Sequence, residues 1–375
     1  MSNLSVLHVI GDGSMGGGTT AVLQLASRMA VLGVRVGIVT QPGTELARTA
    51  PAQGVTVHEL DFSRRLASPL TSRALQRILV KSRPDLVHAH GARAGLPCAL
   101  LTRRAFPAFV YTVHGFHYQK KRAPLRQLAR ISEGKCIARA DATVFVSQAD
   151  KALARADGLL QDRQIGEVIY NGSDGLAGAV LRTSTHDVAF LGRLHHQKNP
   201  LLLAEIARLA TGLRFRIIGD GPLGPALRAR VEELGMTSRF SFLGGLSHHA
   251  ALSALAGSRC MVLPSLWEGL PMAVIEAMHL GLPVVATDMP GLREMILPGK
   301  TGDLVPSGDA RAFAASLVSL LADDAGLRTL GDAARRRAAD LFSLDAQLDR
   351  HLALYRRLLS PETLTSPEPM GELAL

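Results

Sequence analysis

The sequence contains few cysteines and no long apolar run, and each shortage excludes a class of protein. Its three cysteines, Cys98, Cys136 and Cys260, are widely separated and form no CxxC pair. Neither a disulfide framework nor a thiolate zinc site is therefore indicated. No stretch reaches the roughly 18 uninterrupted apolar residues of a membrane-spanning helix. The first residues also lack the basic start and long apolar core of a signal peptide, so we expect a cytoplasmic protein.

Aromatic residues are scarce as well, at 4% of the chain. With no recognised nucleic-acid motif and so few rings on which bases could stack, nucleic-acid binding is disfavoured. The chain is 47% hydrophobic and 20% charged, which is typical of a packed globular protein. Its 375 residues fit two medium domains better than one.

The net charge of +10 is unevenly distributed. Residues 1–170 contain 22 Lys or Arg against 11 Asp or Glu, whereas residues 171–375 contain 20 against 21. A basic first half favours contact with something anionic, such as phosphate groups or an acidic lipid surface. A basic surface that serves only solubility remains the alternative.

Short apolar runs alternate with helical patterns along the whole chain, which predicts an α/β protein with parallel strands joined by helices. In the first half, strands are expected at 6–10 and 34–40 and in runs ending at Leu60, His90, Val113 and Val146. The pattern begins again at 188–191 and continues at 213–218, 239–243, 260–263 and 283–286. We therefore predict two doubly wound parallel sheets, in domains 1–170 and 171–343, with a hinge at 171–175 and a ligand cleft between them.

A glycine-rich loop follows the first strand. Residues 11–16 match GxGxxG, the spacing of a dinucleotide-binding turn. The second strand nevertheless ends Val39-Thr40-Gln41, without the acidic residue that would bind a ribose. A dehydrogenase therefore stays an alternative only. We prefer a role in which Gly16 and Gly17 let the backbone approach a ligand across the cleft, before a helix capped by Thr19.

Two loops of the second half carry the residues suited to a phosphate. Arg193 and Lys198 follow the strand 188–191, and two cations at a strand end favour an anion. The stretch 264–271, which contains Glu268, opens a helix at Pro271 whose free N–H groups favour an anion as well. Glu276 lies eight positions after Glu268, and the two carboxylates could bind hydroxyl groups.

The Glu-x7-Glu stretch, the Gly-Arg-Leu-x3-Lys loop and Gly219-Asp220-Gly221-Pro222 together resemble the retaining glycosyltransferases of family 4, which have the GT-B fold. The likeness extends from the glycine loop to 302–306. It implies a retaining hexosyl- or N-acetylhexosaminyl-transferase that uses a nucleotide-diphosphate sugar, such as a UDP-sugar, and requires no cofactor. It also implies that a helix at about 344–359 crosses back to the first domain, before a flexible tail at 360–375.

The resemblance assigns roles residue by residue. Arg193 and Lys198 would bind the donor diphosphate, Glu276 the ribose, and Glu268 the transferred sugar with help from the amides after it. The remaining donor-binding residues are Gly16, Gly17, Gly219, Gly269 and Leu270. His114 would lie near the sugar as a catalytic residue, together with Arg193, Lys198 and Glu268. No covalent nucleophile is implied, since the departing phosphate is thought to assist attack from the same face.

Histidines and basic residues of the first half point to the acceptor. His88 and His90 match an HxH stretch of the family and are placed on the acceptor side. A zinc site of His88, His90, His114 and His117 is conceivable, but we predict no metal. The basic stretch that contains Lys120, Lys121 and Arg122 is predicted to contact an anionic membrane surface or a lipid diphosphate. A solvated helix face is the alternative.

The Thr-Val-His-Gly-Phe-His run at 112–117 resembles enzymes that build bacterial surface polysaccharides. We therefore expect a glycan or lipid-linked acceptor and a position at the inner face of the membrane. A sugar-nucleotide epimerase of the same fold stays open beside the dehydrogenase.

Overall fold

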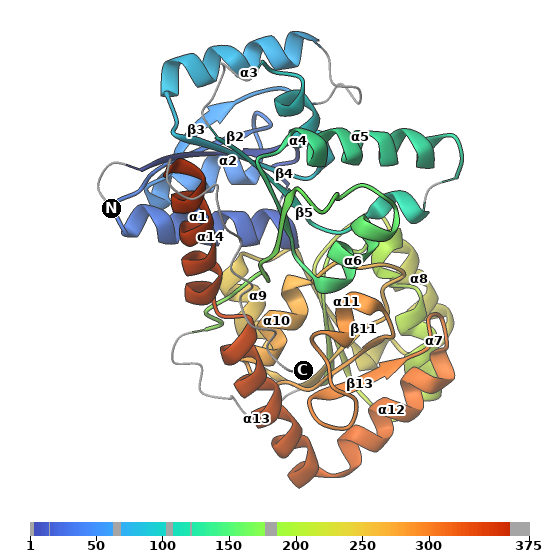
Figure 1. Ribbon diagram of the computed structural model, residues 1–375. Coiled ribbons are helices and arrows are strands. Elements are labelled where there is room, and N and C mark those ends of the chain that lie inside the picture. Colours follow the sequence, from blue (N-terminus) through green and yellow to red (C-terminus); the bar gives the residue numbers. More distant parts are fainter. Residues whose placement is uncertain are drawn as a thin grey trace.

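The structure is a computed structural model that describes residues 4–14, 16–62, 69–102, 108–120, 122–176 and 186–360. The side chains of Pro69, His117 and Lys120 are not described. The predicted flexible tail lies outside the described residues, apart from Ser360. The chain forms two α/β units, one above the other in Figure 1, and each is built on its own sheet.

Seven strands of the first half form a parallel sheet in the order β3-β2-β1-β4-β5-β6-β7. The central strands are buried on both faces, which explains why they read as unbroken apolar runs. The strands are β1 (Ser5–Ile10), β2 (Arg35–Thr40), β3 (Thr56–Glu59), β4 (Leu86–His90), β5 (Ala108–Val113), β6 (Ala142–Phe145) and β7 (Ile165–Val168). The α-helices are α1 (Gly17–Val31), α2 (Glu45–Thr49), α3 (Pro69–Ser82), α4 (Ala92–Ala99), α5 (Leu125–Arg139) and α6 (Gln148–Ala156).

Six strands of the second half form a second parallel sheet in the order β10-β9-β8-β11-β12-β13. They are β8 (His186–Leu191), β9 (Phe215–Ile218), β10 (Phe240–Gly244), β11 (Ser258–Leu263), β12 (Val284–Thr287) and β13 (Gly302–Val305). The helices are α7 (Leu202–Leu209), α8 (Gly224–Glu233), α9 (His248–Leu255), α10 (Met272–His279), α11 (Pro290–Arg293), α12 (Ala310–Ala322), α13 (Asp324–Leu341) and α14 (Leu344–Leu359). The predicted fold class, two parallel α/β sheets, is confirmed.

Helix boundaries differ from the sequence-based expectation at two places. Thr19 does not cap α1, because the helix begins at Gly17 with Gly16 as its N-cap. The hydroxyl of Thr19 instead donates to the carbonyl of Ser14 at 3.0 Å. Pro271 precedes α10 as its N-cap and is not its first residue. Both helices therefore start without a side-chain cap, and their first N–H groups are not covered by a hydroxyl or a carboxylate.

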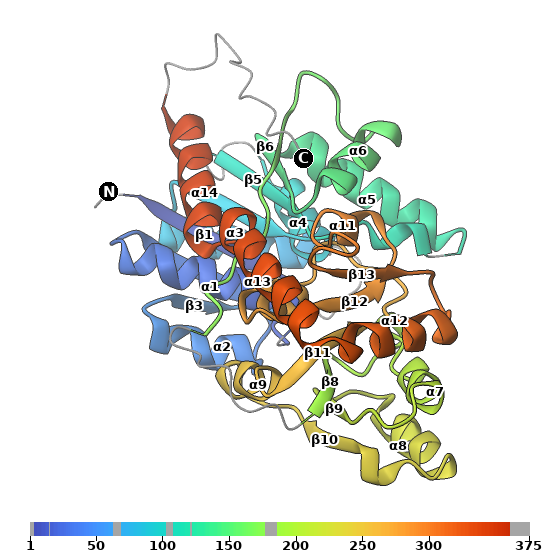
Figure 2. The same ribbon diagram turned by 90° about the horizontal axis from the view of Figure 1, so that it is seen from below.

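Helix α14 belongs to the core of the N-terminal sheet although it follows the second unit in sequence. Leu348, Leu352 and Tyr355 are buried together with Val6, Ile10 and other residues of the N-terminal core. Both views place α14 beside α1 (Figure 1 and Figure 2). None of the helices in the described ranges combines the length and apolar character needed to cross a bilayer.

The chain passes between the two units at two places that touch. Gly172 N donates to Gln347 Oε1 at 3.0 Å, and Ser173 N donates to the carbonyl of Phe342 at 3.0 Å. A Cβ atom at Gly172 would lie 2.2 Å from the carbonyl oxygen of Ser343. Elsewhere, Glu294 of the second unit accepts from the N–H groups of Gln148 and Ala149 at the start of α6.

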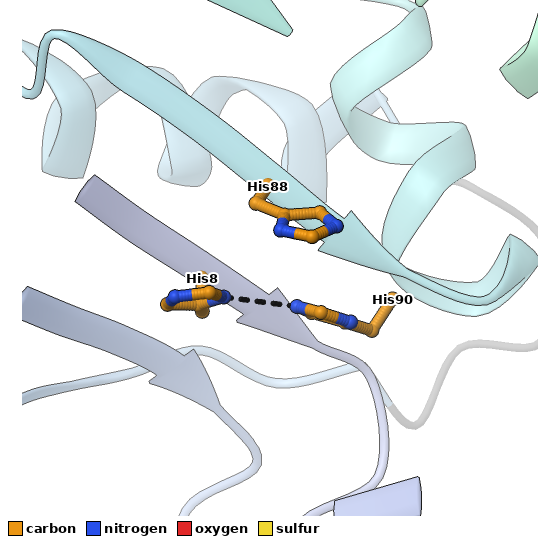
Figure 3. A group of neighbouring side chains, drawn as sticks. All are labelled: His8, His88 and His90. Atoms are coloured by element: carbon orange, nitrogen blue, oxygen red, sulfur yellow. Dashed lines mark hydrogen bonds between the residues drawn. The ribbon is translucent and has the colours of Figure 1, made fainter. Parts of the chain in front are cut away.

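Four histidines of the described residues are buried in the N-terminal core, which is an unusual use of interior volume. His8, on β1, lies opposite His88 of β4, and His90 follows two positions later on the same face of the sheet (Figure 3). His351 of α14 joins them. Burial lowers the pKa of His8 to about 3 and that of His351 to about 4. Burial also lowers the pKa of His88 and His90 well below the usual value.

Gly172→Ala is expected to destabilise the protein by about 1–3 kcal/mol, because the new methyl group overlaps backbone that cannot move without shifting α14. The measurement is the thermal unfolding midpoint. Gly245→Ala is the matched control, since a Cβ there meets only Asp220 at 3.9 Å. Equal midpoints for the two variants would contradict close packing of the two crossings.

The buried histidines predict that the protein loses stability in mild acid. The unfolded chain binds protons at about pH 6.5 that the folded core does not accept, so the free energy of unfolding is highest above that pH and falls as the pH drops. Each such histidine contributes a slope approaching 1.4 kcal/mol per pH unit below about 6.5. His351→Gln should reduce the slope between pH 7.5 and 5.5, measured by denaturant titration, by one histidine's share. An unchanged slope would refute this assignment.

Candidate functional site

The loops that follow β8 and β9 pack directly on one another at the cleft. Leu194 N donates to the carbonyl of Asp220 at 2.8 Å. Gly219 has φ +129°, and a Cβ there would lie 2.1 Å from the carbonyl oxygen of Gly192. Only glycine allows this conformation and this approach. The structure therefore places Gly219 in support of the loop that carries Arg193.

The side chain of Arg193 extends from its loop to the N-terminal unit. A Cβ atom at Gly16 would lie 3.6 Å from Arg193 Nε. Among the described residues, the guanidinium has neither a hydrogen-bond nor an ion-pair partner. One step further along, a Cβ at Gly17 would lie 3.6 Å from the Cβ of Met272, the first residue of α10. The uncapped starts of α1 and α10 thus meet beside an unpaired cation.

Lys198 points toward the loop before α10. Its Nζ lies 2.6 Å from Glu268 Oε1, and the two side chains are 16% and 6% exposed. Gln197 ties the same loops together, because its Nε2 donates to the carbonyl of Trp267 at 3.0 Å and its carbonyl accepts from Leu266 N at 2.8 Å. Two residues predicted to bind the donor are therefore paired with each other.

Glu276 is buried in α10 and has a partner that the sequence did not reveal. His248, from the start of α9, lies with its Nε2 2.7 Å from Glu276 Oε1. The hydrogen bond to this carboxylate raises the pKa of His248. No motif marks His248, and only the packing of α9 against the second sheet brings it to the carboxylate. The ribose-binding residue predicted from the sequence thus already carries a histidine partner.

His114 and the Glu268 loop face each other from opposite units. A Cβ at Gly269 would lie 2.8 Å from the carbonyl oxygen of His114 and 3.2 Å from the Cα of Gly115. Leu270, the next residue, is buried, and its carbonyl accepts from Asn171 at the hinge. The predicted catalytic histidine therefore borders the same cleft as the predicted donor residues.

His88 and His90, which we placed on the acceptor side, are both buried. His88 is fully buried, with its Nδ1 2.6 Å from the hydroxyl of Tyr355 and its Nε2 2.6 Å from Thr112 Oγ1. His90 is buried beneath His114, with its Nδ1 3.1 Å from His114 Nε2. An HxH pattern at a strand end correctly predicts where the strand ends. It does not reveal which face of the sheet a helix will cover.

Among the described residues, one group of histidines has its nitrogens close enough together to bind a metal ion. Nitrogens of His8, His88 and His90 lie within 4.8 Å of one another. This group differs from the set that the sequence suggested, because His8 replaces His114, and the side chain of His117 lies outside the described residues. Both nitrogens of His88 already have hydrogen-bond partners, so a metal would have to displace one of them.

The basic stretch before α5 is only partly described. Arg122 is exposed, whereas Lys121 and the side chain of Lys120 lie outside the described residues. The structure adds a feature that the sequence analysis did not single out, namely three exposed apolar side chains on α5. Leu125, Leu128 and Ile131 are 61%, 54% and 44% exposed. Their three-residue spacing places them on one face of the helix.

The surroundings of the glycine loop fit a ligand shared by two units better than a dinucleotide held by one. Gly16 and Gly17 face Arg193 and Met272 of the second unit. At the end of β2, the side chain of Gln41 donates to Asp61 and accepts from Phe62 N. The arrangement as a whole can hold a doubly charged phosphate group between two helix starts and a guanidinium, beside carboxylates suited to hydroxyl groups.

Family models match both halves of the chain. Residues 16–172 match the glycosyl transferase 4-like domain, and residues 185–323 match the glycosyl transferases group 1. Together the two matches include Gly16, Gly17, His114, Arg193, Lys198 and both carboxylates.

Individual relatives agree with the family models. The chain is 29% identical over 307 residues to the UDP-Gal:alpha-D-GlcNAc-diphosphoundecaprenol alpha-1,3-galactosyltransferase of Escherichia coli, a match that covers 75% of this chain and 78% of that protein. It is 27% identical over 403 residues to the D-inositol 3-phosphate glycosyltransferase of Mycobacterium bovis, covering 97% of this chain and 83% of that protein.

Two solved structures share the fold. Anabaena HepE in complex with UDP and glucose superposes with a TM-score of 0.82 at 18% identity, covering 94% of this chain and 100% of that one. Sucrose-phosphate synthase from Thermosynechococcus elongatus gives a TM-score of 0.80 at 23% identity, covering 94% and 99%. With two parallel α/β units of the GT-B type and both family models matched, the chain belongs to the group 1 glycosyltransferases of family 4.

Proposed function

We propose that this glycosyltransferase moves a hexose or N-acetylhexosamine from a nucleotide-diphosphate sugar to a glycan or lipid-linked acceptor, with retention of the anomeric configuration. The observations that carry the proposal are three contacts: Gly16 of the first unit faces Arg193, Gly17 faces Met272 at the start of α10, and Lys198 pairs with Glu268 in the loop before α10. We further propose that the reaction serves the assembly of a bacterial surface polysaccharide at the inner face of the membrane.

The names of similar proteins support the donor and acceptor classes. The Escherichia coli relative is named for UDP-Gal and for a GlcNAc-diphosphoundecaprenol acceptor. Anabaena HepE was solved with UDP and glucose and also with UDP-glucose. A UDP-sugar donor and a lipid-diphosphate acceptor are the corresponding proposals for this chain.

Arg193 and Lys198 would act mainly on the leaving group. As the glycosidic bond breaks, the nucleoside diphosphate gains negative charge, so fixed cations stabilise the transition state more than the bound donor. A unit charge about 4 Å away is worth roughly 4 kcal/mol at an effective dielectric near 20. The first N–H groups of α1 and α10 would add to this stabilisation because the positive ends of both helix dipoles point at the same group.

Donor binding would exchange one partner of Lys198 for another. In the structure Lys198 is paired with the nearly buried Glu268. A diphosphate beside Lys198 would compete for the ammonium group and release Glu268 to accept hydrogen bonds from the sugar hydroxyls. Glu276, held by His248, would accept from the ribose in the same manner. Both carboxylates are thus kept paired until hydroxyl groups replace or join their partners.

Retention would follow from attack on the same face that the phosphate leaves. The backbone of His114 borders the loop of Glu268 and Gly269, so the acceptor must approach from the N-terminal side of the sugar. The leaving phosphate oxygen is then the base nearest to the acceptor hydroxyl and can take its proton. An epimerase would need no such approach, and a dehydrogenase would need a nicotinamide beside the glycine loop.

A panel of nucleotide sugars tests the proposal. We expect free nucleoside diphosphate to appear in step with a glycosylated product, and an α-linked donor to give an α-linked product by proton NMR. An isomerised nucleotide sugar would indicate the epimerase, and NADH turnover would indicate the dehydrogenase. A product of inverted configuration would refute retention while leaving the transfer reaction intact.

Arg193→Ala in the same assay is expected to lower kcat/KM by roughly 10²–10³-fold, as loss of one fixed transition-state partner does in other enzymes. Arg208→Ala is the matched control, because Arg208 is an exposed cation on α7 of the same unit that is paired with Glu205. Equal effects of the two substitutions would contradict a phosphate site at Arg193.

The face of α5 formed by Leu125, Leu128 and Ile131 supports the proposed membrane contact. Exposed Arg122 and Arg126 flank these apolar side chains, and a basic helix with an exposed apolar face is suited to an anionic lipid surface. Helix α5 lies at the outer side of the N-terminal unit (Figure 1), on the half of the chain that carries the excess positive charge.

Vesicle flotation checks the membrane contact. We expect stronger recovery with acidic than with neutral lipid, and weaker recovery on acidic vesicles after Leu125→Ser with Leu128→Ser. Val31→Ser with Val80→Ser is the control, since both valines are exposed apolar residues on other helices. Equal recovery on acidic and neutral vesicles, or equal loss in the two variants, would remove α5 from the proposal.

A further inference from the structure

One carboxylate of the candidate site is buried in an otherwise apolar part of its helix. Glu276 lies in α10 between Ile275 and Ala277, which are both buried, and its own side chain is 5% exposed. A carboxylate taken out of water is costly unless it is paired and hydrogen-bonded. The neighbours of Glu276 on α10 offer no such pairing, so its partners must come from other elements.

His248 supplies one of these partners from the first turn of α9. Its Nε2 lies 2.7 Å from Glu276 Oε1. An ionised carboxylate has lone pairs but no hydrogen, so the imidazole is the donor of this bond. The hydrogen bond to Glu276 also raises the pKa of His248, which favours the charged and therefore stronger form of the bond. His248 thus holds one oxygen of the carboxylate from the protein side.

The second oxygen of the same carboxylate remains available. Within the described part of the chain, Glu276 Oε2 has no hydrogen-bond partner, and it is not one of the fully buried polar atoms that lack one. It therefore keeps contact with solvent. A carboxylate can accept about four hydrogen bonds, roughly two at each oxygen. Two neighbouring hydroxyl groups could therefore bind to Glu276 without displacing His248.

Helix α10 places this carboxylate one turn behind the proposed phosphate site. Met272, four positions before Glu276 and on the same side of the helix, faces Gly17 of the first unit. Four residues advance a helix by about 6 Å. In a nucleoside diphosphate the ribose follows the diphosphate directly. A donor whose phosphate lies at the start of α10 can therefore extend its ribose toward Glu276.

We infer that His248 is a positioning residue that holds Glu276 for the two ribose hydroxyls, and so makes the site selective for ribonucleotides over deoxyribonucleotides. The inference rests on the proposed function, because it assumes that Glu276 binds the ribose of the donor. His248 acts through Glu276 and not by contact with the nucleotide. A carboxylate that is already held at Oε1 has little rotational freedom left to lose when the ribose binds.

Neutralisation of a buried charge is the competing explanation for this pair. If His248 only offsets the cost of burying Glu276, its loss lowers stability and weakens the binding of every nucleotide alike. If it positions Glu276, its loss weakens the binding of nucleotides that carry both ribose hydroxyls more than that of deoxynucleotides. The ratio of two dissociation constants measured on one variant separates the explanations, because any unfolded fraction of the protein cancels from it.

The next residue of α9 offers a matched control. His249 is exposed, whereas the side chain of His248 is 36% exposed and contacts Glu276. His249→Leu therefore removes an imidazole from the same helical turn and leaves the contact to Glu276 in place. Two substitutions of His248 complete the set. His248→Leu keeps an apolar side chain but removes the donor, and His248→Gln extends an amide N–H to about the position of Nε2.

Nucleotide binding without turnover tests the inference. The probe is the tightest binder among UDP, GDP and ADP, compared with its 2′-deoxy counterpart by isothermal titration calorimetry. We expect the wild type to bind the ribonucleotide about tenfold or more tightly, as loss of a hydrogen bond to a charged group allows. His248→Leu should reduce this ratio several-fold toward one, whereas His248→Gln and His249→Leu should retain most of it. An unchanged ratio in His248→Leu would overturn the inference.

A double substitution shows whether His248 acts through Glu276. Glu276→Gln should lower the ratio, and the addition of His248→Leu should lower it no further, because residues that act as one unit have non-additive effects. Additive effects, or a ratio near one in the wild type, would overturn the inference and leave the proposed function intact. Failure of the wild type to bind any of the three nucleoside diphosphates would instead refute the proposed function, and the inference with it.

Discussion

Parallel pairing in both sheets is the constraint from which the arrangement of this molecule follows. Parallel strands need a crossover after each strand, so every strand of a sheet ends at the same edge. In this chain the two sheets turn these edges toward each other. Loops that are far apart in sequence, such as those at Gly16, His114, Arg193 and Glu268, therefore meet in one cleft. The proposed reaction depends on residues from all of these loops, and no single loop carries them all.

The described charged side chains of the candidate site form pairs, apart from one arginine. Lys198 is matched by Glu268, and Glu276 by His248. Pairing limits the cost of keeping charged groups in a partly dry cleft. Arg193 has no such partner among the described residues and is exposed, so it is the first of these cations that an approaching anion meets. Glycine backbone on the opposite wall leaves room for that anion beside the guanidinium.

Much of this was predictable from the sequence, because strand periodicity and the motifs after strand ends are local signals. The two-sheet fold, the motif loops and the strand positions follow from them, except for the two edge strands β7 and β13, which the sequence analysis did not predict. The partners of the motif residues do not, since Lys198–Glu268 and Glu276–His248 join segments 28 to 70 residues apart. The sequence also failed to show that His88 and His90 face α14, because a period of two gives alternation but not the identity of the covering helix.

The contact between Gly172 and Ser343 determines how the two units can move. Both crossings of the chain pass through this one place, so they would act as a single pivot and not as two separate tethers. Rotation about such a pivot changes few contacts near it and displaces the distant loops most. Opening would therefore separate the two units at Arg193 far more than it changes the packing of α14 on the N-terminal sheet. The buried histidines would move with the N-terminal unit as a rigid body.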